Sequence, residues 1–361
     1  MSYPFRDHYH RTRKALGGVL NGLWPRNDFA RLAHPLQELR KPIASDAGPA
    51  ILPDQAKTFL REWATREDTE AVYRMVRPCT VDPKMGILFS QGRVLWGSSD
   101  QPERERNPRF FSHVKAPARR FPAAILLHHV HGDNYFHFFL YVLSKAAVAD
   151  LHDVPGNVPL LVPARTAQTA FFRQAQELGV FGDRKVIVQG KQEVVEVETA
   201  YVVRAFFNHR PYYDWMCQGL RAGGRPDARR RIFVLRGKSA ANGRQFRNQQ
   251  DVNTLAVQHG FELIDPGHLS LREQADIFSE AAVIAGAHGA GLTNLIFRTG
   301  TQCHIIELFS PSMGSPHYYM LAKELGFTYQ SLMTEDPRGR DFTASTQVDL
   351  AALEEAFRRL N

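Results

Sequence analysis

Residues 282–294 read AVIAGAHGAGLTN, which is a short apolar run, a glycine-rich turn and the start of a polar segment. An apolar run of this length, ended by turn residues, is typical of a buried parallel strand. The glycines let the backbone turn tightly, and we expect a short helix over residues 291–297 directly after them. A strand that passes through a glycine turn into a helix predicts an α/β domain.

Strands and helices alternate on both sides of this turn. Towards the C-terminus we expect strands at residues 232–235, 261–264 and 304–308, and helices at 250–259 and 270–280. The second of these helices starts with a capping box, Ser270 and Glu273. Towards the N-terminus we expect strands at 123–127, 159–162 and 185–188, and helices at 135–150 and 166–178. Such βαβ units predict two doubly wound, Rossmann-like domains that face each other across a cleft.

A turn-rich, charged stretch at residues 219–230 separates the two sets of elements and predicts a linker. We therefore expect a first Rossmann-like domain at 121–218 and a second at 231–340, followed by a C-terminal helix at 341–361. Residues 1–120 show one clear amphipathic pattern, a helix over 53–66. We expect this region to be an extension that packs partly on the first domain.

The composition is that of a folded protein with a basic balance. Hydrophobic residues make up 43% and charged residues 23% of the 361 residues, so a sizeable core can form. The formal charge of +8 favours polyanionic partners, which include nucleic acids, anionic lipids, nucleotides and acidic glycans. A non-enzymatic polyanion binder is thus an alternative class. No helix-turn-helix or RNA-recognition motif is visible, so we expect no nucleic-acid partner.

The N-terminus and the cysteines indicate where in the cell the protein is located. Residues 1–42 combine basic and apolar side chains, as an arm on an anionic membrane surface does, although an exposed leader has the same composition. The three cysteines, Cys79, Cys217 and Cys303, are far apart and indicate a reducing compartment. No signal-peptide pattern or membrane-spanning run is present. We expect a cytoplasmic enzyme, with a peripheral contact at the inner membrane through the basic arm.

The glycine turn predicts a diphosphate site. Ligands of open α/β sheets bind outside the carboxyl ends of the strands, where the next helix presents free backbone N–H groups. The polar side chains of the turn add further hydrogen-bond donors, whereas a purely structural turn would need only the glycines. The residues expected on the donor side here are His288, Gly289, Ala290, Gly291, Thr293 and Asn294.

Two further elements support a nucleotide. Glu307 ends the next strand, where a carboxylate can accept hydrogen bonds from ribose hydroxyls. This feature also raises the alternative of a nucleotide-dependent oxidoreductase, but the glycine order is G-x-x-G-x-G and it opens the third βα turn of its domain rather than the first. Arg236 and Arg244 follow the strand at 232–235, and guanidinium groups can neutralise a diphosphate without a metal. The sequence has no Asp-x-Asp pair that could hold a metal ion at the diphosphate.

Residues 128–137, HHVHGDNYFH, follow a strand and enter a helix in the first domain. His137 is our preferred general base for a sugar hydroxyl, with His131 or Asp133 as the alternatives. Asn134 shares a helix face with His137 and would bind the acceptor. His131, Asp133 and His137 are also plausible metal ligands, but no spacing here is diagnostic of zinc, and we expect no metal.

A second polar and aromatic stretch precedes the linker. Within it, His209 and Tyr212 would bind the acceptor, since aromatic rings stack on sugar faces, although aromatics before a hinge also pack structurally.

Taken together, these motifs resemble glycosyltransferase family 61, in the bacterial branch often labelled capsular polysaccharide biosynthesis protein. The resemblance covers about residues 126–327. It rests on HGAGLTN at 288–294, IEL at 306–308, NYFH at 134–137, and the strand at 232–236 with Arg244 and Asn248 downstream.

The resemblance implies a GT-B fold and an inverting, metal-independent transfer from a nucleotide-sugar to a carbohydrate acceptor, without a cofactor. By the same resemblance, residues 288–294 and Arg236 would serve the donor, and Asn134 with His137 would face the acceptor. One residue departs from the family pattern: Gln249 follows Asn248, where the family usually has glutamate.

Overall fold

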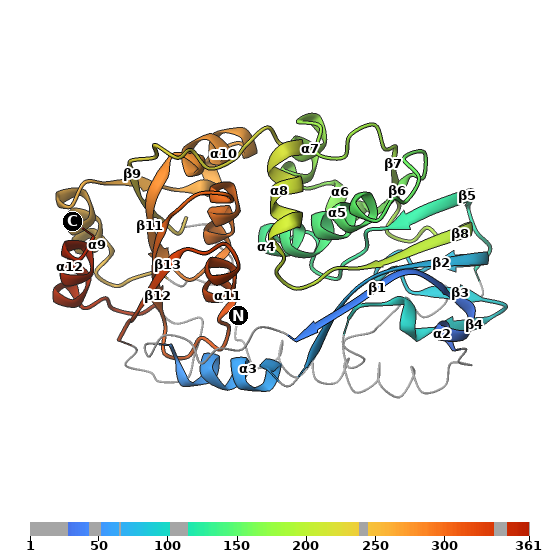
Figure 1. Cartoon of the computed structure of the whole chain (residues 1–361), viewed down its shortest axis with the longest axis horizontal. Helices are drawn as coiled ribbons and strands as arrows, with labels where there is room; N and C mark the ends of the chain where they lie inside the picture. The colour runs from blue at the N-terminus through green and yellow to red at the C-terminus, as the bar shows by residue number, and fades with distance from the viewer. Residues whose placement is uncertain are drawn as a thin grey trace, which may run out of the picture.

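The computed structural model describes residues 28–42, 52–64, 66–101, 115–237, 245–335 and 345–360. Over these residues the chain forms two separate sheets, one of eight strands and one of five, with helices packed against both (Figure 1). The predicted α/β class is therefore confirmed. No helix in these ranges has the length and apolar character to cross a bilayer.

The first sheet is mixed. In spatial order its strands are β4 (Arg93–Leu95), β3 (Leu88–Ser90), β2 (Glu67–Val81), β8 (Val195–Arg204), β5 (Arg119–Leu126), β6 (Leu160–Pro163) and β7 (Val186–Gln189), and β1 (His34–Pro42) pairs with β2. The pairings among β8, β5, β6 and β7 are parallel, and those among β1, β2, β3 and β4, together with β2–β8, are antiparallel.

Half of the strands described in this sheet come from the region that we expected to be an extension. The burial of β2 follows no strict alternation along its 15 residues. The period-2 pattern by which a half-buried strand is recognised is therefore missing from the sequence. The fold thus makes β1, β2, β3 and β4, from residues 34–42 and 67–95, an integral part of the first sheet.

Most helices of the first half lie on the side of its sheet that faces the second half (Figure 1). They are α4 (Tyr135–His137), η3 (Phe138–Leu143), α5 (Ser144–Leu151), α6 (Ala164–Ala167), α7 (Ala170–Glu177) and α8 (Arg210–Gly219). The opposite face packs on α2 (Phe29–Leu32) through Phe29, and η1 (Trp96–Ser98) lies beside α2. Among the described residues, this sheet is therefore covered unevenly, unlike the doubly wound arrangement that we expected.

The second sheet is wholly parallel within the described residues. Its order is β10 (Phe261–Ile264), β9 (Arg230–Val234), β11 (Ala281–Ala287), β12 (His304–Phe309) and β13 (Thr328–Met333). Its outer face packs on α9 (Gln249–Gln258) and α12 (Leu350–Arg358). Its inner face packs on α10 (Leu271–Ser279), η5 (Ala290–Arg298) and α11 (His317–Glu324), and η4 (Pro266–His268) follows β10.

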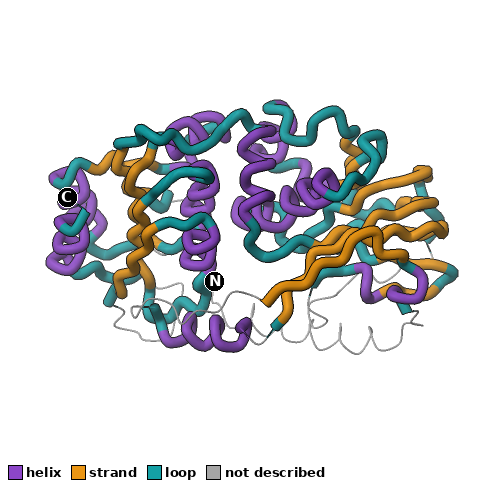
Figure 2. Tube along the Cα trace, viewed as in Figure 1, coloured by secondary structure: helices purple, strands orange, loops and turns teal. Residues whose placement is uncertain are grey.

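The helices of both halves meet between the two sheets, as Figure 2 shows. They share one cluster of buried apolar side chains that includes Phe139 from the first half and Phe297 from the second. The centroids of these two rings lie 6.1 Å apart. α3 (Asp54–Ala64) joins the same cluster through Ala56 and Leu60. The two halves are therefore held together by a continuous apolar core.

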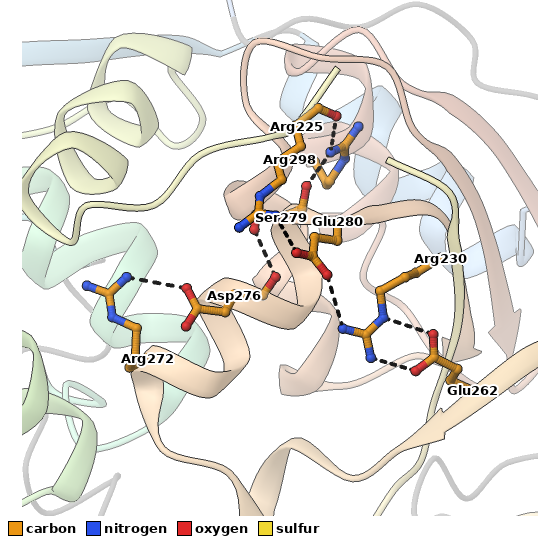
Figure 3. Close-up of polar contacts among 8 residues, drawn as sticks. All are labelled: Arg225, Arg230, Glu262, Arg272, Asp276, Ser279, Glu280 and Arg298. Atoms are coloured by element: carbon orange, nitrogen blue, oxygen red, sulfur yellow. Dashed lines mark hydrogen bonds and ion pairs between the residues drawn. The ribbon is translucent and has the colours of Figure 1, made fainter. Parts of the chain in front are cut away.

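The stretch predicted as a linker runs between α8 and β9, and arginine side chains hold it to the second half (Figure 3). Arg298 is only 2% exposed, and its Nη1 donates to the carbonyl oxygen of Arg225 at 3.0 Å. Arg225 in turn forms an ion pair with Glu280 at 2.5 Å. Arg272 donates to the carbonyl oxygen of Arg221 at 3.1 Å. These bonds satisfy carbonyl groups of the linker and fix its path.

The capping box predicted at the start of α10 is confirmed. The amide of Ser270 donates to Glu273 at 2.7 Å, and the amide of Glu273 donates to the Ser270 hydroxyl at 3.3 Å. Ser270→Ala should lower the free energy of unfolding by about 1 kcal/mol, because it leaves an N–H of the first turn without its acceptor.

A thermal melt measures this effect, as a fall of about 1–2 °C in the melting temperature. Ser270→Asn is the matched control, since asparagine also caps helices and should keep the melting temperature near that of the wild type. An unchanged melting temperature in Ser270→Ala would show that this cap does not stabilise the fold.

Candidate active site

A cavity of about 700 Å³ lies between the two halves. Its volume is in the range of small-molecule sites. On one side it is lined by the loops that follow β9, β10, β11 and β12, and on the other by α4 and α7. The carboxyl ends of the second sheet thus form one wall, and helices of the first half form the other.

The strand order of the second sheet places its crevice at the glycine turn. β9 comes first along the chain. The next strand, β10, pairs on one side of β9, and the following strand, β11, pairs on its other side, so the strand order reverses between β9 and β11. Ligands of open α/β sheets bind at such a switch point. Arg236 follows β9 and Gly289 follows β11, and both line the cavity there.

Close packing explains the glycines of the turn. A Cβ atom at Gly289 would lie 2.8 Å from Nη1 of Arg236, and one at Gly291 would lie 2.8 Å from Cγ1 of Val234. Either contact is too short for a side chain. The turn therefore lets the Arg236 guanidinium lie directly on the backbone.

Arg236 is the cation of this wall. Its Nη1 donates to the carbonyl oxygen of His288 at 2.8 Å, whereas its buried Nε has no hydrogen-bond partner among the described residues. Burial lowers the pKa of Arg236, but an arginine stays charged at any physiological pH. A buried guanidinium with an unmatched N–H, lining a cavity, is suited to an anionic ligand.

His288 lies beside Arg236 with its ring fixed. Its Nδ1 is 2.6 Å from Oε1 of Glu307, and its ring stacks on Phe309 with centroids 5.2 Å apart. Glu307 is fully buried, and its Oε2 accepts a hydrogen bond from Tyr329 at 2.6 Å. Glu307 does not line the cavity, where we expected it to contact a ribose. It contacts His288 because Glu307 and Gly286 are paired in neighbouring strands.

Thr293 and Asn294 also lie behind the cavity wall rather than on it. Both side chains are fully buried in η5. Asn294 accepts from the Tyr135 hydroxyl at 2.6 Å and donates to Gln274 at 2.9 Å. Neither residue lines the cavity, where we predicted direct donor contacts for them. Asn294 instead ties α4 of the first half to the glycine turn.

His137 lines the opposite wall. Asn134 caps α4, since its side-chain oxygen accepts from the amides of Phe136 at 3.0 Å and His137 at 3.4 Å. The π-helical segment η3 begins directly after His137, and such segments are frequent at functional sites. Burial lowers the pKa of His137 to about 4. The imidazole is therefore uncharged at neutral pH and able to accept a proton.

The two alternative bases lie off the cavity. Asp133 forms an ion pair with Arg165 at 2.5 Å, and His131 is exposed beside His137 with ring centroids 5.1 Å apart. Within the described ranges, no group of three or more His, Cys, Asp or Glu side chains is arranged to hold a metal. Of the three proposed bases, the structure brings only His137 to the cavity.

We predicted acceptor contacts for His209 and Tyr212, and neither residue lines the cavity. Tyr212 is fully buried, and its hydroxyl donates to the carboxylate of Glu70. His209 pairs with Glu324 at 3.6 Å. Aromatic residues before the linker thus belong to the core between the two halves. Arg244 and residues 1–27 of the basic arm lie outside the described residues.

Sequence reasoning missed several polar residues of the cavity, among them His317 and Asp265. Burial lowers the pKa of His317 to about 3, and its ring stacks on Phe136 with centroids 5.0 Å apart. Phe59 of α3 contacts the same imidazole, so the N-terminal region supports this wall. Both residues occur shortly after strands of the second sheet, which is the signal that could have found them.

A family model matches residues 135–306, which include His137, Arg236 and His288. Its description is Glycosyltransferase 61. Over 71 residues the chain is 35% identical to a beta-1,2-xylosyltransferase of Arabidopsis thaliana, which is 20% of this chain and 13% of that protein. Over 65 residues it is 32% identical to beta-1,2-xylosyltransferase RCN11 of Oryza sativa subsp. japonica, which is 18% of this chain and 12% of that protein.

The chain therefore spans about an eighth of the length of these curated relatives. The matched family and both of these relatives are described as glycosyltransferases. These matches agree with the resemblance to family 61 that we inferred from the sequence, and they do not extend it to the bacterial capsular type.

Proposed function

We propose that the chain transfers a sugar from a nucleotide-sugar to a carbohydrate acceptor, with inversion and without a metal. One observation carries the proposal: Arg236 and His288 lie at the switch point of the parallel sheet, across a cavity of about 700 Å³ that His137 also lines. A cationic wall facing an uncharged base meets the two needs of this reaction, which are a site for the leaving diphosphate and a proton acceptor.

We place the donor on the second half. The diphosphate would contact the backbone amides of the glycine turn and the guanidinium of Arg236, in a dry site where such charges act strongly. Asp265 and His268 also line the cavity and would lie towards the nucleoside. We further propose that residues 121–218 and 231–340 form the two domains of a GT-B arrangement, with the acceptor on the first and the donor on the second.

The transfer we propose is a single displacement. An acceptor hydroxyl oxygen forms a bond to the anomeric carbon while the bond from that carbon to the diphosphate oxygen breaks. The hydroxyl proton passes to His137, and the electron pair of the broken bond stays on the diphosphate, beside Arg236 and His288. The sugar passes through an oxocarbenium-like state and its anomeric configuration inverts.

The bacterial resemblance supports a role in surface polysaccharide synthesis. A cytoplasmic location with a peripheral contact at the inner membrane remains part of the proposal, and the absence of a disulfide among Cys79, Cys217 and Cys303 fits a reducing compartment.

A thermal-shift screen tests the donor site. A nucleoside diphosphate at 100 times its dissociation constant should stabilise the fold by about 2.7 kcal/mol, because it binds only the native state. Nucleotide-sugars should give a comparable shift, and NAD or heparin should give none. A shift with NAD alone would favour the oxidoreductase alternative, a shift with heparin alone would favour the polyanion binder, and no shift with any nucleotide would contradict the proposed donor site.

A further inference from the structure

The structure contains two hydrogen-bond chains, and in each of them a tyrosine contacts a glutamate that contacts a histidine. In one, Tyr329 donates to Glu307 at 2.6 Å, and the other carboxylate oxygen is 2.6 Å from Nδ1 of His288. In the other chain, Tyr212 donates to Glu70, whose second oxygen is 2.6 Å from Nε2 of His152. Glu307 is 0% and Glu70 is 3% exposed, so both carboxylates are buried.

Only the first chain reaches the cavity. His288 lines it beside Arg236, whereas His152 follows the end of α5 and is not among the lining residues. A buried carboxylate needs a positive partner, and the imidazole is the one group in each chain that can become a cation. The same kind of hydrogen-bond chain is thus present twice, once at the candidate active site and once away from it.

The neighbours of His288 define what its free nitrogen faces. Glu307 of β12 holds Nδ1, and Tyr329 of β13 holds Glu307 in turn. Tyr318 of α11 lies edge-on to the ring, with centroids 5.2 Å apart, and Arg236 donates to the backbone oxygen of His288. The other titratable side chains on this half of the cavity include His317, whose pKa burial lowers, Asp265 and His268, and His137 lines the opposite wall. Nε2 is left as the ring nitrogen available to a bound molecule.

We propose that Glu307 is a positioning residue that makes His288 take up a proton when the donor diphosphate binds, so that the imidazolium donates from Nε2 to the leaving phosphate. This inference rests on the proposed function. With Glu307 at Nδ1 and a phosphate oxygen at Nε2, the ring lies between two anions, and only the doubly protonated imidazolium donates to both. The proton comes from solvent, and the positive charge then faces the bond that breaks.

Isothermal titration calorimetry of uridine diphosphate and guanosine diphosphate, at pH 8 in buffers of different ionisation enthalpy, measures this proton uptake. The wild type should take up protons as the nucleotide binds, because the bound phosphate places a second anion beside the imidazole that Glu307 already contacts. Glu307→Gln keeps the size of the side chain and removes the charge. It should take up no proton and bind about tenfold more weakly, the loss of one charge-assisted contact.

Three variants separate this role from a structural one. Glu70→Gln makes the same change in the second chain and should keep the wild-type affinity and proton uptake. Tyr329→Phe keeps the carboxylate and should keep the proton uptake. His288→Gln should match Glu307→Gln, and the double variant should bind no more weakly than either single variant, because Glu307 acts through His288.

The outcomes distinguish the two proposals. If neither nucleotide binds the wild type, the proposed function fails. If a nucleotide binds and Glu307→Gln still takes up a proton, or if Glu70→Gln loses affinity to the same extent, the role of Glu307 is overturned while the proposed function stands.

Discussion

His137→Ala is expected to lower the rate of sugar transfer by about 10³-fold and to leave the affinity for a nucleoside diphosphate nearly unchanged. The reason is the position of His137, which lines the cavity on the wall opposite Arg236 and the glycine turn. In the proposed mechanism its imidazole removes the acceptor proton, whereas the donor phosphates lie on the other half. Steady-state rates and calorimetric dissociation constants for the same variant measure the two effects separately.

His131→Ala is the matched control, because His131 is a neighbouring histidine that does not line the cavity. It should keep most of the activity. Undiminished transfer by His137→Ala would remove this residue from the mechanism, and His317, a cavity histidine whose pKa burial also lowers, would become the base to test.

The pH dependence of the wild type follows from the environment of His137. Burial lowers its pKa to about 4, so the proton-accepting form is present above that pH and is lost as the pH falls through it. The acidic limb of kcat/KM, which reports groups of the free enzyme, should therefore lie well below the value of an ordinary histidine.

Arg236→Met is expected to weaken the binding of a nucleoside diphosphate by about 100-fold, the loss of a hydrogen-bonded charge pair in a buried site. The guanidinium is held on the glycine turn by its bond to the backbone oxygen of His288, and its buried Nε has no partner among the described residues. A ligand anion would complete that bonding. Titration calorimetry checks the affinity.

Arg236→Lys should recover part of the loss, because lysine keeps the charge but not the planar fork. Arg165→Met removes an arginine of similar reach that pairs with Asp133 away from the cavity, and it should bind as the wild type does. Wild-type affinity in Arg236→Met would exclude this residue from the donor site and leave the glycine turn as the test of the proposal.

Local patterns predicted much of the second sheet. The strand expected at residues 261–264 is β10 (Phe261–Ile264), and the capping box at Ser270 starts α10 as predicted. Apolar periodicity and caps depend on residues a few positions apart, so they can be recognised along the chain. β2 and β8 were missed because their partners are distant in sequence, as the pairing of Met75 with Ala200 illustrates.

The roles of the polar residues depend on contacts that no local pattern contains. Glu307 contacts His288 rather than a ribose because β11 and β12 pair in one register, with Gly286 opposite Glu307. Tyr212 is buried because α8 packs between the halves, where its hydroxyl reaches Glu70, 142 positions away.

By itself, the sequence determined the α/β class, the glycine turn and the chemical types of the residues around it, since these follow from short-range periodicity and composition. Only the tertiary structure decided which of His131, Asp133 and His137 reaches the cavity, and that His317 shares it. Strand register and the packing of two halves place side chains to within an ångström or two, and both arise from interactions between residues far apart in the chain.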